Sequence, residues 1–283
     1  MSDGKVLVLG DDTRSFLAIV RSLGRKGIDV HCAPANFRAP ALASRYVGAV
    51  HDIPPWIPQD GDAWLEAMET LLRAEAFDLV IPCDETALLP LQQARARLAP
   101  LARLAIPDDR SIAVLFDKHE TRELARRLAV NVAPGRLLAA ADTAATIVGE
   151  FGTPIFVKPR HSYALGTLAT RGAARRADSA EALEALLGRC RPGETVLEAA
   201  FPGDGVGISV LAHRGRISLA FEHHRAREES GAAYYRVSAP LHAERAEACA
   251  RPNIRISSSS AGAISAAAPS PRRCSPPDSA IRG

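Results

Sequence analysis

The feature that most constrains the fold is the alternation of short apolar runs with longer amphipathic segments over residues 5–107. Three runs have the length and composition of strands buried in a parallel sheet: KVLVL (5–9), IDVHCA (28–33) and FDLVIPC (77–83). The intervening segments place apolar residues at helical spacing, at 15–27, 62–76 and 84–98. Within the last of them, Pro90 predicts a kink or a restart. Strands alternating with helices predict a doubly wound α/β domain, with its ligand edge at the carboxyl ends of the strands, at 10–13 and 82–86.

The pattern changes beyond residue 107. Two helical segments are followed by strands and helices, including a helix capped by Asp178 or Ser179 and a loop that contains Gly166. From Thr195 the pattern favours antiparallel strands, with a hairpin turn at His213–Gly215. We therefore expect an α+β domain behind the α/β domain. The expected divisions are 1–112 for the α/β domain, 113–194 and 195–248 for the two parts of the α+β domain, and 249–283 for the tail.

The tail differs in composition from the rest of the chain. Of the 32 residues over 252–283, eight are Ser, six are Ala and five are Pro, and no periodicity could bury a face. Such a segment is expected to be disordered, because it cannot offset the entropy lost on ordering. It is either a genuine extension or an out-of-frame reading of a GC-rich gene, and we favour the second. The nucleotide sequence beyond the codon for Leu241 distinguishes them.

Composition excludes several classes of protein. The chain is 47% apolar and 24% charged, as is usual for a globular protein, and its formal charge of +3 gives no reason to expect a nucleic-acid or membrane partner. No apolar stretch approaches the roughly 20 residues of a membrane helix. The five scattered cysteines lack C-x-x-C spacing, which fits reduced thiols and a cytoplasmic location.

Three charged residues spaced forty apart have the right chemistry for a nucleotide. Lys118 begins a charged helix, Lys158 closes the apolar run PIFVKPR, and Glu198 lies within the apolar run VLEAAF. Two ammonium groups can hold a polyphosphate, and a carboxylate inside a strand needs a polar partner such as a nucleoside. Taken singly, each has an ordinary alternative: a solvated helix face, a strand-end lysine and an exposed edge-strand glutamate.

Two arginines are candidate contacts for a substrate or a phosphate. Arg225 lies in the cluster FEHHRARE and Arg236 in YYRVSAP. Either could bind a carboxylate through two parallel hydrogen bonds, and either could instead form a surface salt bridge. Asp11 and Asp12 are expected to cap a helix or to line a substrate cleft.

Six segments in register resemble one family. VLVLGDD, LVIPCDE, FDKHETRELA, VKPRHSYALG, VLEAAFPGDGVGISVL and YYRVSAPL are similar to the carboxylate–amine ligase branch of the ATP-grasp superfamily, near the carbamoyl-phosphate-synthase type, over about residues 4–241. The resemblance implies a Rossmann-like pre-ATP-grasp domain followed by an ATP-grasp domain. It implies that ATP and a small carboxylate are partners, that Lys118 and Lys158 bind phosphates, and that Glu198 meets the nucleoside. The backbone of the flanking residues Leu197, Ala199, Ala200 and Phe201 would complete that contact.

The sequence departs from the family at its C-terminal end. ATP-grasp enzymes continue with an acidic E-x-N motif that holds Mg²⁺, and nothing past Leu241 supplies it: Glu244 and Glu247 lie on a helical pattern with no strand after it. We therefore expect a truncated ATP-grasp domain without metal ligands, and little or no ligase turnover. The alternatives are a non-catalytic nucleotide-binding or interaction module, and an α/β binding domain with unrelated appendages. An oligomer is possible.

Overall fold

The computed structural model describes residues 4–10, 13–58, 60–168, 171–201, 203–213, 216–229 and 232–250. The predictions for Asp11, Asp12 and the tail from residue 251 lie outside these residues. None of the described helices has the length and apolar character needed to cross a membrane.

The N-terminal part is a five-stranded parallel sheet of order β3-β2-β1-β4-β5, which confirms the predicted α/β architecture. Its strands are β1 (Lys5–Leu9), β2 (Asp29–Ala33), β3 (Ala49–Val50), β4 (Leu79–Pro82) and β5 (Arg103–Leu104). Its helices are α1 (Thr13–Gly24), η1 (Pro40–Ala43), α2 (Gly61–Glu75), α3 (Glu85–Gln93) and α4 (Arg95–Leu98).

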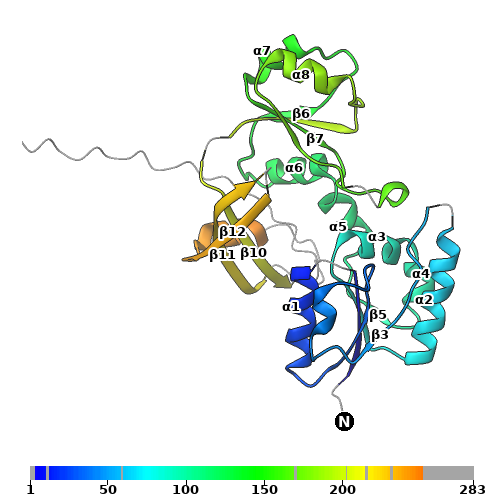
Figure 1. Ribbon diagram of the computed structural model, residues 1–283. Helices are drawn as coiled ribbons and strands as arrows, with labels where there is room; N and C mark the ends of the chain where they lie inside the picture. Colours follow the sequence, from blue (N-terminus) through cyan, green and yellow to red (C-terminus); the bar gives the residue numbers. More distant parts are fainter. Residues whose placement is uncertain are drawn as a thin grey trace, which may run out of the picture.

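Both faces of this sheet are covered, as Figure 1 shows for α1 and α2 on opposite sides. Successive side chains of a strand point to opposite faces. Val6 and Val8 of β1 accordingly pack with α1, whereas Leu7 and Leu9 pack with α2 and α3. The helical segment predicted over 84–98 runs through Pro90 and is interrupted at Ala94, after which α4 begins at Arg95.

The carboxyl ends of β1 and β4 meet tightly at the predicted ligand edge. Gly10 has φ +108°, and a Cβ there would lie 2.5 Å from Cys83 Sγ and 2.6 Å from Asp84 Oδ2. Only glycine fits this backbone conformation and this close approach. Asp84 also caps α3 by accepting a 3.0 Å hydrogen bond from the Ala87 N–H.

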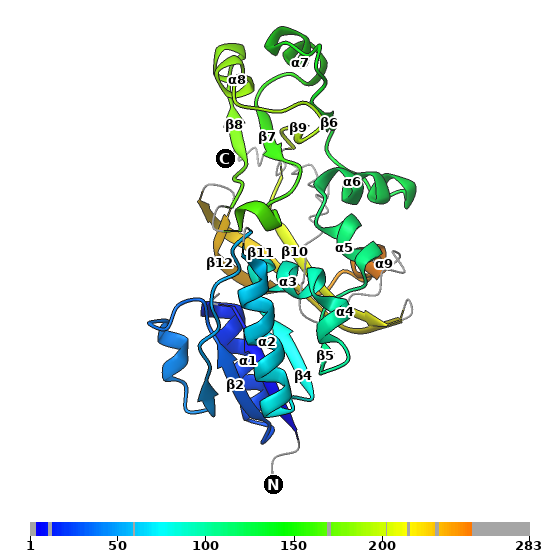
Figure 2. The ribbon, with the colours of Figure 1, turned by 90° about the vertical axis from the view of Figure 1, so that its right-hand side faces the viewer.

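Helices α5 (Asp109–Leu115) and α6 (Lys118–Arg127) lead to a second, four-stranded antiparallel sheet of order β6-β9-β7-β8. Its strands are β6 (Gly135–Leu137), β7 (Ile155–Pro159), β8 (Arg175–Ala177) and β9 (Thr195–Ala199), joined by α7 (Ala144–Phe151), η2 (Leu165–Thr167) and α8 (Ala180–Leu187). Ser179, rather than Asp178, caps α8. Ile155, Val157 and Leu197 are buried in one core cluster with residues of α7 and α8, and α6 lies on the opposite side of this sheet (Figures 1 and 2).

The third sheet is antiparallel and has the order β10-β11-β12. It consists of β10 (Val206–His213), β11 (Arg216–Glu229) and β12 (Ala232–Ala239), followed by α9 (Ala243–Ala250). Strands β10 and β11 pair in an antiparallel arrangement that includes His213 with Arg216, whereas residues 214–215 of the expected hairpin turn lie outside the described residues. In Figure 1 this sheet lies to the left of α5 and α6, and in Figure 2 it lies between the parallel sheet below and the four-stranded sheet above.

One expected boundary between parts of the chain does not coincide with the boundary between two sheets. The boundary between residues 194 and 195 separates β9 from the sheet to which it belongs, because Glu198 pairs with Gly135 of β6 and with Phe156 of β7. The change from one sheet to the next falls between Ala199 and Val206. A period-two pattern identifies a strand, but it does not identify the strand's partners.

Candidate functional site

Lys118 is held at the start of α6, against the end of β7. Its ammonium donates to the Pro159 carbonyl at 2.9 Å and to Ser162 Oγ at 3.0 Å, and its backbone N–H donates to the Arg160 carbonyl. Burial, followed by the positive charges of Lys158 and Arg171, lowers the pKa of Lys118 to about 8. The ammonium therefore lies in a cationic environment that an anion would stabilise.

Asp117 fixes this helix start. Its carboxylate accepts from the backbone N–H groups of His119 and Glu120, and it accepts from Arg160 Nε at 2.7 Å. Burial raises the pKa of Asp117, but these hydrogen bonds and the Arg160 charge outweigh burial and hold the pKa below its usual value. The cap therefore ties α6 to the residue that follows β7.

Lys158 and Glu198 share one face of the four-stranded sheet, the face away from α7 and α8. The Lys158 ammonium donates to Glu198 Oε1, and Arg122 Nη1 of α6 donates to Glu198 Oε2 at 3.0 Å. The structure thus brings together the three residues that the sequence singled out. Their roles toward a nucleotide remain predictions.

Arg122 is the site residue that sequence reasoning missed. Its side chain is buried, and its Nε and Nη2 have no hydrogen-bond partner among the described residues. It lies over Gly135, where an added Cβ would approach Arg122 Nη2 to 3.1 Å. The available signal was spacing, since Arg122 is four residues after Lys118 and therefore lies on the same helix face.

The residues flanking Glu198 offer mainly backbone groups. Leu197 is fully buried on the α7 and α8 side, so its side chain faces away from the ion pairs. The N–H groups of Ala199 and Ala200 donate to the carbonyls of Pro134 and Pro154, while Phe201 is 42% exposed. These bonds hold the end of β9 in a defined position.

Arg225 and Arg236 are paired directly across β11 and β12. Burial, and then the charges of Arg236 and Arg225, lower the pKa of the neighbouring His223. The expected role of the two arginines as substrate or phosphate contacts remains a prediction.

The carboxylate of Glu198 is already held by Lys158 and Arg122, whereas Mg²⁺ prefers several oxygen ligands. Among the described residues, the only group of three His, Cys, Asp or Glu side chains with metal-ligand spacing lies elsewhere, in the N-terminal domain.

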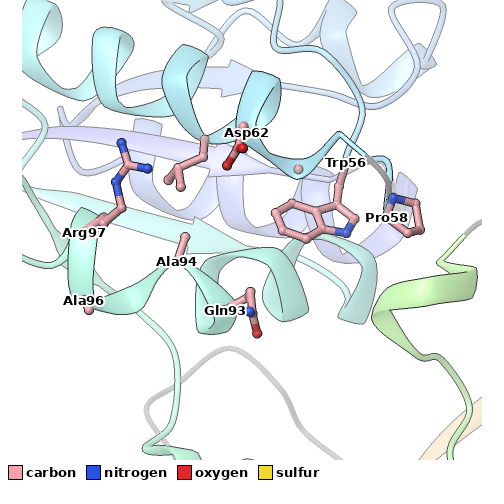
Figure 3. A pocket seen from close by; sticks show the side chains of 9 residues that line it. Trp56, Pro58, Asp62, Gln93, Ala94, Ala96 and Arg97 are labelled. Atoms are coloured by element: carbon pink, nitrogen blue, oxygen red, sulfur yellow. The ribbon is translucent and has the colours of Figure 1, made fainter.

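A separate pocket of about 390 Å³ lies between the start of α2 and the α3–α4 junction (Figure 3). Trp56 and Gln93 line it, and Arg97 there forms an ion pair with Glu69 at 2.7 Å. No residue expected to bind ATP lines this pocket.

Comparison with solved structures identifies the fold. The L-amino acid ligase from Bacillus licheniformis superposes with a TM-score of 0.61 at 14% identity, over 90% of this chain and 62% of that one. The N5-carboxyaminoimidazole synthetase from Staphylococcus aureus, complexed with ADP, gives 0.62 at 13%, over 89% and 62%. The biotin carboxylase domain of the Hydrogenobacter thermophilus 2-oxoglutarate carboxylase, complexed with MgADP, ADP and bicarbonate, gives 0.62 at 18%, over 89% and 58%.

The chain therefore has the ATP-grasp fold, as the six sequence segments implied. It spans about three fifths of the length of these solved proteins. No family model and no curated protein matches the sequence.

Proposed function

We propose that this chain binds ATP on the face of the four-stranded sheet that carries Lys158 and Glu198, beside α6. Lys118 and Lys158 hold the phosphates. Glu198 binds the nucleoside, together with the backbone of Leu197 and Ala199–Phe201. One observation carries the proposal: three residues forty apart in sequence converge at the junction of α6, β7 and β9. The ADP complexes among the solved structures of this fold support it.

Arg122 explains how Lys158 can serve a phosphate although it contacts Glu198. When Lys158 turns toward a phosphate, Glu198 keeps the Arg122 guanidinium as its partner. Its carboxylate is then not left unpaired in a partly buried position, which would cost on the order of 1–3 kcal/mol or more. Lys158 can therefore exchange the Glu198 carboxylate for a phosphate of ATP.

The parent reaction we propose is ATP-dependent ligation of a carboxylate to an amine. A carboxylate oxygen of the substrate attacks the γ-phosphorus of ATP, giving an acyl phosphate and ADP. The amine nitrogen then attacks the acyl carbon, phosphate leaves and the nitrogen loses a proton. Arg225 and Arg236 would hold the carboxylate or the transferred phosphoryl group, since arginine binds either through paired hydrogen bonds.

Turnover by the chain itself is proposed to be low, because its described residues supply no carboxylate cluster for magnesium. In ATP-grasp enzymes Mg²⁺ neutralises charge on the phosphates. The alternative remains a nucleotide-binding module without catalysis. Such a module would bind ATP independently of magnesium. The scattered cysteines support a cytoplasmic location as part of this proposal.

Calorimetric titration with ATP tests the binding site. Lys158→Ala and Lys118→Ala should each weaken binding roughly tenfold or more, as expected for a lost charge-assisted hydrogen bond. Lys26→Ala removes an exposed lysine of the N-terminal domain and is the matched control. Equal affinity in all three variants would contradict the proposed site. ATP-dependent ADP release that Lys158→Ala abolishes would instead show that the chain turns over.

A further inference from the structure

A second cluster of ligand-bearing side chains lies at the β2–β3 side of the parallel sheet, beside the end of α2. His31 comes from β2, His51 directly follows β3, and Glu75 ends α2. One ligand atom from each residue lies within 4.8 Å of the other two. His31 Nδ1 is 2.8 Å from His51 Nε2 and 3.9 Å from Glu75 Oε2.

We propose that His31, His51 and Glu75 form a zinc-binding site. Two imidazole nitrogens and one carboxylate oxygen form a ligand set that zinc favours, and a water molecule would complete the tetrahedron. Ligand atoms about 2.0–2.2 Å from a shared zinc lie a little over 3 Å apart. Small side-chain rotations would therefore bring the observed distances between the ligand atoms to that value. The site is independent of ATP binding.

The surroundings resemble those of a metal-binding histidine. His31 Nε2, the nitrogen that faces away from the cluster, lies 3.2 Å from Asp29 Oδ2. A carboxylate that accepts from the remote ring N–H fixes the tautomer that presents Nδ1 to a metal. Phe77 packs its ring edge-on against both imidazoles, with centroids 5.3 and 6.1 Å away, and limits their rotation.

Lys5 competes with zinc for the Glu75 carboxylate. Its ammonium donates to the Glu75 carboxylate, lies 3.2 Å from the Glu75 carbonyl and is 5.2 Å from the centre of the Phe77 ring. Without metal, Lys5 therefore supplies the positive charge that Glu75 requires. Zinc would displace this ammonium from the carboxylate, so Lys5 lowers the affinity of the site.

The experiment uses the full chain with Cys249 and Cys274 replaced by serine, so that the tail thiols do not bind zinc. Calorimetry with Zn²⁺ should show one site per chain. His51→Ala should abolish it, Asp29→Asn should weaken it roughly 10- to 100-fold, and Lys5→Met should tighten it roughly tenfold. His224→Ala, which removes an exposed histidine on β11, should leave it unchanged.

Two further measurements guard against misfolding and adventitious binding. Circular dichroism should show that His51→Ala and the more conservative His51→Gln retain the fold. Bound Co²⁺ should show visible absorption typical of a four-coordinate ion, without the near-ultraviolet band that thiolate ligands give. Absence of stoichiometric binding even in Lys5→Met, or binding that survives in folded His51→Ala, overturns the proposal.

Discussion

The role given to Arg122 leads to a specific prediction for Arg122→Met. In the native protein Glu198 has two cationic partners, Lys158 on one oxygen and Arg122 on the other, the latter at 3.0 Å. In the variant, Lys158 is the only partner left. Turning Lys158 toward a phosphate would then leave a partly buried carboxylate unpaired. ATP must therefore compete with Glu198 for the same ammonium.

The expected loss of ATP affinity follows from the strength of the hydrogen bond between Arg122 and Glu198. A hydrogen bond to a charged group contributes about 1.5–3 kcal/mol, so ATP should bind roughly 10- to 100-fold more weakly to the variant. The free energy of unfolding should change by less than about 1 kcal/mol, since removing the guanidinium also removes two buried nitrogens, Nε and Nη2, that lack partners among the described residues. Methionine keeps most of the apolar packing of the arginine stem.

Calorimetric titration with ATP, paired with urea denaturation, separates these two effects. Arg127→Met replaces an exposed arginine on the same helix and should leave ATP affinity unchanged. In a Glu198→Gln background no carboxylate charge remains to be paired, so adding Arg122→Met should have little further effect. Wild-type affinity in folded Arg122→Met, or an equal loss in the Glu198→Gln background, would refute the reasoning.

Four other predictions concern pH dependence, a buried ion pair and an exposed apolar residue. ATP affinity should fall as pH rises through about 8, because Lys118 loses its proton there while phosphate, with a second pKa of about 6, keeps its charge. Titrations with ATP from pH 7 to 9.5 should show the fall in affinity, and Lys118→Arg should remove the pH dependence. Over the same interval the free protein should gain stability in urea denaturation relative to Lys118→Met, because Lys118 in the unfolded chain, with the ordinary lysine pKa of 10.5, binds more protons than Lys118 in the native state. Arg245→Ala should destabilise the protein by about 3 kcal/mol in urea denaturation, since the fully buried Glu222 would lose its arginine and keep His242, whose N–H donates at 2.8 Å and whose Nδ1 lies 3.7 Å away; an effect below about 1 kcal/mol would contradict this. Leu219→Ser should reduce self-association measured by light scattering while changing stability by less than about 0.5 kcal/mol, because Leu219 is 65% exposed on β11, next to the exposed side chains of Leu211, Ile217 and Phe221; unchanged scattering would show that these side chains do not drive association.

The sequence determined the local elements and the chemistry of individual residues. Buried runs such as 5–9 are apolar because both faces of a parallel sheet are covered, so these strands could be predicted from composition alone. The order of Lys118, Lys158 and Glu198, each at a recognisable helix start or on a strand, was sufficient to predict that they lie in one site. The ATP-grasp fold was predicted from the resemblance of six segments to that family.

Only the tertiary structure decided which groups are partners. Strand pairing placed β9 between β6 and β7, and so brought Glu198 to Lys158. The packing of α6 on that sheet brought in Arg122, whose residue type also suits a solvated helix face. The cluster of His31, His51 and Glu75 depends likewise on three separate elements meeting at one edge of a sheet. Contacts between distant segments depend on sheet order and helix packing, which no short pattern in a single sequence specifies.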